Sequence, residues 1–170
     1  MSDCISQSLF FLYIQVMKTF VPILQFVLIS FLIGYISMLL QREAMITWYP
    51  TLVRSPLTPP GFVFSIVWSV LYLLMGISAG LVWNTNSMYS WMLILLFIVQ
   101  LVLNLGWTFC FFYMQSPVLG FAILVVLFMF VVLYVTGCYA QNKWAAIINF
   151  PYLLWLLFAG YLNLYVVINN

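Results

Sequence analysis

The sequence predicts an all-α membrane protein, a bundle of five transmembrane helices, and three observations lead to that fold class. Hydrophobic residues make up 68% of the 170 residues and charged residues 4%, which leaves too little polar surface to cover a water-soluble globule. The mean hydropathy of +1.23 is correspondingly high. Long apolar stretches, each able to cross a bilayer at about 20 residues per span, alternate with short polar or proline-containing segments.

The predicted spans follow one another through most of the chain. They cover residues 20–40, 62–83, 89–113, 117–139 and 144–168. Pro22 is expected in the first turn of the first span and Pro117 at the start of the fourth, where a missing N–H costs nothing. Pro151 lies inside the fifth span and predicts a kink or local distortion. We therefore expect residues 20–168 to form one five-helix domain.

Residues 1–19 form an N-terminal extension whose role the sequence leaves open. The apolar run at residues 9–16 is too short to span a bilayer, and Lys18 separates it from the first long stretch. An interfacial helix, a continuation of the first span and a cleaved signal segment all fit this pattern. Met17 is an alternative to Met1 as the start of the chain.

Residues 41–61 form the longest polar segment, and we expect this loop to fold over one end of the bundle. Four prolines punctuate it, namely Pro50, Pro56, Pro59 and Pro60. Proline fixes its own φ angle and restricts the residue before it. The loop is therefore predicted to be stiff and extended.

Two tryptophans lie too deep in their spans to belong to the aromatic belts at the membrane surfaces. Trp83, Trp91 and Trp144 are at predicted span ends, where the belt explains them. Trp68 and Trp155 lie about 10 and 16 Å into their helices at 1.5 Å per residue. These two indoles need another explanation.

Helical spacing groups each deep tryptophan with further side chains. The two faces consist of Phe64, Trp68, Tyr72 and Met75, and of Tyr152, Trp155, Ala159 and Asn163. Such faces are compatible with ordinary packing between helices and with the walls of a pocket.

Gln100, Asn104 and Thr108 occupy one face of the third span at intervals of four residues. Because unpaired amides in hydrocarbon are costly, this face is expected to point into the bundle or a cavity. Gly76 and Gly80 form a GxxxG element, at which helices approach closely. A seam with a second copy and a packing site within the chain are equally compatible with it.

The residues that ordinary enzyme chemistry needs are scarce. The chain has no histidine, and its three cysteines, Cys4, Cys110 and Cys138, lie far apart. Neither a metal site nor a general base near neutral pH is therefore expected. No cofactor is expected, and a net charge of only +2 argues against a nucleic-acid partner.

A set of ordered motifs resembles the TspO/MBR family of translocator and tryptophan-rich sensory proteins. They are WYPTL at 48–52, LTPPGFVF at 57–64, VWSVLYLLMG at 67–76, QLVLNLGW at 100–107 with FF at 111–112, PYLLW at 151–155 and FAGYLN at 158–163. The resemblance implies a five-helix bundle, often dimeric, whose pocket is closed by the first loop. It further implies porphyrins, sterols or synthetic aromatic molecules as ligands.

The resemblance also suggests roles for individual residues. Trp48 and Tyr49 resemble the loop aromatics above the pocket, Asn104 its polar contact and Ala159 a small residue that tunes ligand access. Phe121 stands where many members have tryptophan. Together with the aromatic faces, the expected ligand-binding residues are Trp48, Tyr49, Trp68, Tyr72, Asn104, Trp107, Phe121, Trp155 and Ala159.

The expected function is that of a membrane receptor or sensor that binds a porphyrin or related hydrophobic molecule and regulates tetrapyrrole or stress homeostasis. A first alternative is an enzyme, because Trp68 and Trp155 resemble the pair implicated in light- and oxygen-dependent porphyrin breakdown in some bacterial members. A second is a transporter of tetrapyrrole or sterol. Expected partners are the small molecule, membrane lipid and a second copy of the chain.

The expected location is a multi-pass position in the bacterial cell membrane, or in the mitochondrial outer membrane if the source is eukaryotic. The positive-inside rule leaves the orientation open. Lys18 and Lys143 fall on one side of the membrane, whereas Arg42 and Arg54 fall on the other.

Overall fold

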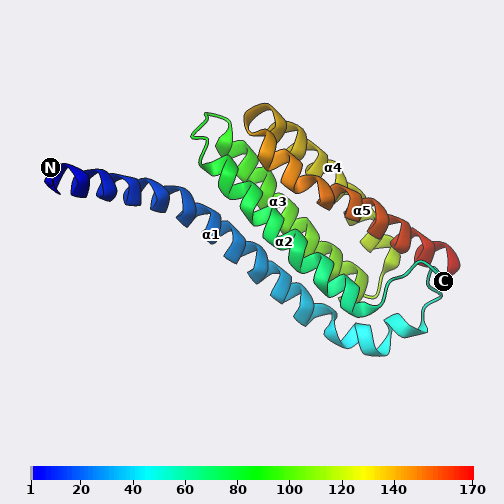
Figure 1. Cartoon of the computed structure of the whole chain (residues 1–170). Helices are drawn as coiled ribbons and strands as arrows, with labels where there is room; N and C mark the ends of the chain where they lie inside the picture. The colour runs from blue at the N-terminus through cyan, green and yellow to red at the C-terminus, as the bar shows by residue number, and fades with distance from the viewer. Residues whose placement is uncertain (1) are drawn as a thin grey trace.

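A computed structural model describes residues 2–170, and the chain forms five long helices with no strand in that range (Figure 1). The helices are α1 (Ser2–Thr47), α2 (Gly61–Trp83), α3 (Ser90–Thr108), α4 (Pro117–Gln141) and α5 (Lys143–Asn169). Every one of them contains a stretch long and apolar enough to cross a membrane. The predicted fold class, an all-α membrane bundle of five spans, is confirmed.

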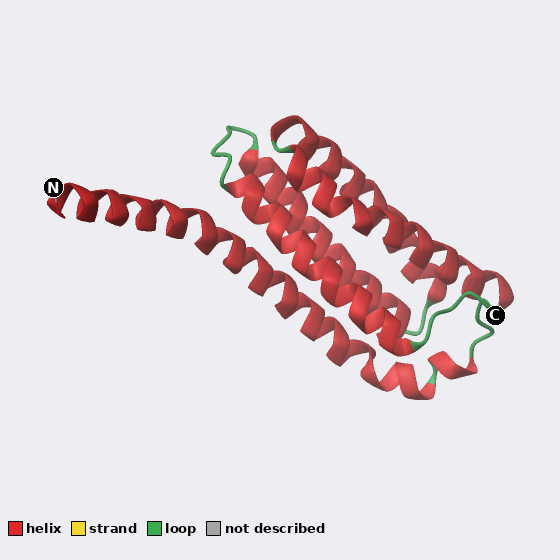
Figure 2. Ribbon diagram, viewed as in Figure 1, coloured by secondary structure: helices red, strands yellow, loops and turns green. Residues whose placement is uncertain are grey.

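Successive helices run in opposite directions (Figure 2). The largest interfaces are formed by α1 with α2 and by α4 with α5. A π-helical turn, Phe109–Tyr113, extends α3, and a 3-10 turn, Tyr49–Thr51, lies just after α1. The loop after α1 and the ends of α3 and α5 therefore meet at one end of the bundle.

The first helix is longer than the predicted span at both ends. It includes the described part of the N-terminal extension, which projects beyond the rest of the bundle (Figure 1). Pro22 consequently lies in the helix interior rather than in a first turn. Met1 lies outside the described residues, so the choice between Met1 and Met17 as the start stays a prediction.

The covering loop is shorter than expected, because α1 continues past its first polar residues. The prediction ended the first span at residue 40, but Gln41, Arg42 and Glu43 are good helix formers, and the helix runs on to Thr47. The loop between α1 and α2 thus comprises residues 48–60. This boundary matters because the last turns of α1 become part of the site.

The GxxxG element joins α2 to α1 within one chain. A Cβ atom on Gly76 would overlap the backbone of Val27, and one on Gly80 would overlap Ile23. Small residues permit this approach, which brings the two helix backbones into direct contact. Of the two alternatives left open by the sequence, the structure shows packing within the chain.

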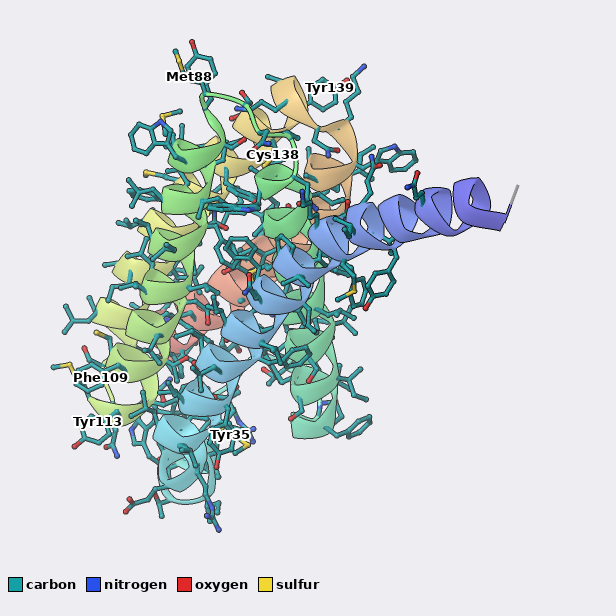
Figure 3. The ribbon with its side chains drawn as sticks, turned by 90° about the vertical axis from the view of Figure 1, so that its left-hand side faces the viewer. Tyr35, Met88, Phe109, Tyr113, Cys138 and Tyr139 are labelled. Atoms are coloured by element: carbon teal, nitrogen blue, oxygen red, sulfur yellow. The ribbon has the colours of Figure 1, made fainter. Side chains whose placement is uncertain are left out.

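The polar face of α3 points into the bundle, as predicted. Gln100, Asn104 and Thr108 are 1%, 1% and 2% exposed. The outer surface is apolar and aromatic instead. Figure 3 shows Phe109 and Tyr113 pointing away from the bundle, and their rings stack with centroids 5.0 Å apart. This is the side-chain distribution expected for a bundle surrounded by lipid.

Candidate ligand-binding site

A cavity of about 330 Å³ lies beneath the covering loop, at the end of the bundle where α1, α3 and α5 finish and α2 begins. Its lining includes an aromatic group, Tyr49, Phe64, Trp68, Trp107, Phe111 and Phe112. Polar side chains are fewer, and they are Gln41, Tyr49, Arg54, Thr58 and Asn163. A mostly apolar lining with a few convergent polar groups is typical of small-molecule sites.

Three rings form a stacked row along one wall of this cavity. The Trp68 and Trp107 ring centroids are 5.9 Å apart with an angle of 29° between the planes. Trp107 stacks in turn on Phe111, at 6.0 Å and 29°. The row joins α2 to the end of α3 and gives the cavity a continuous aromatic wall.

The orientation of Trp107 is fixed by hydrogen bonds in the core. Its indole Nε1 donates to Asn163 Oδ1 over 3.2 Å, and Asn163 Nδ2 donates to the carbonyl of Pro117 over 2.8 Å. Because Asn163 is 2% exposed, both of its amide ends need such partners. The pair therefore holds the middle ring of the row in place.

The π-helical turn brings two neighbouring phenylalanines into the same cavity. The Met114 N–H donates to the carbonyl of Phe109, five residues earlier, over 2.9 Å. This wider turn helps Phe111 and Phe112 to be buried together, at 3% and 6% exposure. π-helical turns are frequent at functional sites, where they redirect side chains.

A second cavity of about 290 Å³ lies between α1, α2 and α3. It shares Gln41, Phe64, Trp68 and Trp107 with the first cavity, so the two adjoin at this group. Its polar wall contains Asn104. The amide of Asn104 accepts a hydrogen bond from Tyr72 Oη over 2.7 Å and donates one to Tyr152 Oη over 3.1 Å.

Two sets of hydrogen bonds fasten the covering loop to α5. Asn170 Oδ1 accepts from the Val53 N–H over 2.9 Å, and its Nδ2 donates to the Val53 carbonyl over 3.2 Å. The hydroxyls of Ser55 and Tyr161 are 3.0 Å apart. The loop is thus held by residues more than 100 positions further along the chain.

Tyr49 is one of two loop aromatics, with Trp48, that contact the aromatic wall. Its ring lies 5.7 Å from Phe112, and the Arg54 guanidinium lies 5.1 Å from the ring centroid on Tyr49. Burial raises the pKa of the Tyr49 phenol, and the nearby Arg54 charge opposes that rise only in part. The phenol therefore stays protonated and neutral beside the guanidinium at physiological pH.

The structure divides the predicted site residues among three places. Those that line the first cavity are Tyr49, Trp68, Trp107 and Ala159. Those that line the second are Trp68, Tyr72, Asn104 and Trp107. Trp48, Phe121 and Trp155 line neither.

The three residues outside the cavities have identifiable surroundings. Trp48 packs edge-on against Phe111 at 5.6 Å, and Trp155 packs edge-on against Trp68 at 6.5 Å. The buried Trp155 indole N–H has no hydrogen-bond acceptor within the described residues. Phe121 is half-buried, because it follows the inward-facing Gly120 and is turned about 100° away from it.

Sequence reasoning missed part of the lining. Gln41 and Met45 were assigned to a loop but belong to the end of α1. Phe111 and Phe112 were noted only as a motif, and their joint burial depends on a π-helical turn that no residue pattern predicted. The only feature of the sequence that pointed to this part of the lining was the presence of two adjacent phenylalanines.

The fold and the site together define a multi-pass membrane protein with an aromatic cavity at one end of a five-helix bundle. The model of the TspO/MBR family matches residues 26–168, almost the whole of that bundle. The chain belongs to the TspO/MBR family.

Relatives are found in distant organisms. The chain is 39% identical over 120 residues to the tryptophan-rich protein TspO of Chlorobaculum tepidum, covering 68% of this chain and 75% of that protein. It is 31% identical over 116 residues to a tryptophan-rich sensory protein of Cereibacter sphaeroides, covering 68% and 72%. The bovine translocator protein is 31% identical over 155 residues, covering 84% and 86%.

Proposed function

We propose that this protein is a membrane receptor or sensor that binds porphyrins or related flat hydrophobic molecules in the cavity beneath residues 48–60. The observation that carries the proposal is the stacked row of Trp68, Trp107 and Phe111. A large conjugated ring gains both apolar burial and stacking against such a wall. The names of two relatives, tryptophan-rich sensory protein and translocator protein, agree with a sensory or translocating role.

The distribution of tryptophans provides a direct test. Trp68 and Trp107 line the cavity. The far end of the bundle, where α2 ends and α3 and α5 begin, carries Trp83, Trp91 and Trp144. Protoporphyrin IX added in the dark, in detergent, should quench tryptophan fluorescence saturably. Trp68→Phe should remove part of the quenching and weaken affinity.

The matched control for this experiment is Trp91→Phe, at the far end of α3. Trp91 is 66% exposed and is not among the residues that line either cavity. We expect this variant to bind with the affinity of the unmodified chain. An absence of saturable quenching in the unmodified chain would eliminate the porphyrin-binding proposal.

A second candidate function is light- and oxygen-dependent breakdown of the bound porphyrin. The contact of Trp155 with Trp68, at 88° between the ring planes, supports it. The excited porphyrin would take one electron from Trp68 and pass it to oxygen, and Trp155 would return one electron to Trp68 and be left oxidised itself. Illumination of the aerobic complex should then produce new absorbance bands at a rate lowered in Trp155→Phe. Unchanged porphyrin spectra under light would exclude this activity.

A further inference from the structure

The covering loop brings one permanent positive charge to the cavity. Among the described residues that line it, Arg54 alone is charged. The chain has two acidic residues, Asp3 and Glu43, and Glu43, whose side chain the structure describes, does not belong to the lining. Among the described side chains, no carboxylate of the lining would therefore compete with an anionic group of a bound ligand for Arg54.

The residues on both sides of Arg54 are anchored. Asn170 binds the N–H and the carbonyl of Val53, and the buried Ser55 hydroxyl lies 3.0 Å from Tyr161 Oη. These bonds use none of the donors of the Arg54 side chain. The backbone of residue 54 is thus held at the rim of the cavity while its guanidinium stays available.

The guanidinium itself lies over an aromatic face. Its Cζ atom is 5.1 Å from the centroid of the Tyr49 ring, a ring that also lines the cavity. A cation at that distance is attracted to the ring quadrupole. The contact orients Arg54 beside the Tyr49 phenol. A guanidinium has five N–H donors, so a pair of them can still bind a carboxylate.

The two buried asparagines of the cavities already use their amide groups in hydrogen bonds. Asn163 uses its two amide ends on Trp107 and Pro117. Asn104, in the adjoining cavity, uses its two ends on Tyr72 and Tyr152. An anion would have to break these buried bonds to bind there, which carries the cost of leaving their partners unpaired.

We propose that Arg54 selects ligands that carry a carboxylate, binding that group at the rim while the apolar body of the ligand lies against Trp68 and Trp107. The inference rests on the proposed function and adds a ligand class to it, namely aromatic carboxylates. A porphyrin with free propionates is preferred over the same porphyrin as its ester. Arg–carboxylate pairs with two parallel hydrogen bonds supply both strength and orientation.

The test compares protoporphyrin IX with its dimethyl ester, using fluorescence quenching in the dark. Arg54→Gln should weaken binding of the free acid about ten- to one-hundredfold, the usual range for a hydrogen bond to a charged group. The same variant should leave binding of the ester unchanged. Arg54→Lys should restore part of the affinity, because it keeps the charge but loses the planar fork.

Arg42→Gln is the matched control, since it removes the same charge from an exposed position on α1 that is not part of the lining. It should leave both affinities unchanged. Equal affinities of acid and ester for the unmodified chain, or equal losses of both in Arg54→Gln, would overturn carboxylate selection while leaving porphyrin binding intact. Failure of both porphyrins to bind the unmodified chain would overturn the proposed function, and with it this inference.

Discussion

The backbone of Val27 occupies the space that a Cβ atom on Gly76 would need. This relationship fixes how α1 lies against α2, because the helices touch through their backbones at that level. The same contact determines where the two helices are close and where they leave room for side chains. Along α2, this contact lies further from the covering loop than the two cavities do, towards the end of the bundle formed by residues 84–89.

Gly76→Ala is expected to destabilise the bundle by about 1–3 kcal/mol, the usual cost of overpacking a tightly fitted contact. Unfolding in mixed detergent micelles, followed by circular dichroism, measures the effect. Gly106→Ala is the control, because the nearest atom to its added Cβ would be Ile123 Cδ1 at an ordinary 3.8 Å. Equal stabilities of the two variants would contradict the close seam between α1 and α2.

Asn104→Ala is expected to cost more stability than either tyrosine substitution beside it. The alanine leaves the hydroxyls of Tyr72 and Tyr152 buried without the amide, at about 1–3 kcal/mol for an unsatisfied group. Tyr152→Phe leaves one buried group unpaired, the Asn104 Nδ2 donor, whereas the alanine leaves two. A double-mutant cycle of Asn104→Ala with Tyr152→Phe should show coupling, and additive effects would refute the shared network.

Asn170→Ala is expected to loosen the covering loop without unfolding the helices. Both backbone hydrogen bonds of Val53 to Asn170 are lost, so amide exchange across residues 48–60 should accelerate. Hydrogen–deuterium exchange with mass spectrometry measures this directly. Asn169→Ala is the neighbouring control, because its amide bonds only to the Tyr165 carbonyl within α5. Unaltered exchange in Asn170→Ala would show that the hydrogen bonds between Asn170 and Val53 do not hold the loop.

Ala159→Leu is expected to lower ligand affinity at least tenfold while the fold persists. Ala159 is 4% exposed and lines the first cavity, so a larger side chain would fill space that the ligand needs. Porphyrin titration measures affinity, and thermal unfolding tests the fold. Ala122→Leu, on the exposed side of α4, is the control for added volume. Undiminished affinity in Ala159→Leu would place the ligand elsewhere.

The stability of the protein is expected to fall above about pH 10, partly because of Tyr49. Its pKa is raised by burial, so the unfolded chain loses this proton first as the pH rises. The unfolded state then binds fewer protons than the folded state, and unfolding becomes more favourable. Melting temperatures compared between the unmodified chain and Tyr49→Phe should diverge only in this alkaline range. If the melting temperatures of the two proteins changed with pH in parallel over the whole range, the raised pKa of Tyr49 would be ruled out.

The observed helix boundaries lie close to the expected ones where proline or glycine marks a helix start. Pro117 begins α4 and Gly61 begins α2, and α5 lies within one residue of the predicted range. The end of α1 was misplaced, because Gln41 to Glu43 are polar without being helix breakers. Polarity indicates where a chain can meet water, but it does not by itself end a helix.

The composition of the site was predicted in part. The deep position of Trp68 and the spacing of Gln100, Asn104 and Thr108 correctly indicated interior faces. Trp155 and Phe121 were expected in the pocket, but the structure places them behind Trp68 and beside an inward-facing glycine. Both residues are near the site. A small rotation of a helix about its axis decides whether a side chain lines a cavity or packs behind its wall.

The sequence by itself determined that this protein is a bundle of five membrane-spanning helices with an amide-bearing face turned inward. The reason is local, since backbone groups in hydrocarbon must be satisfied within each helix and unpaired amides must avoid lipid. Only the tertiary structure decided three further features. The backbone of α1 contacts Gly76, Asn170 forms hydrogen bonds with Val53, and a π-helical turn contains both Phe111 and Phe112. These contacts join residues far apart in the chain or depend on how helices rotate against one another, which no local pattern specifies.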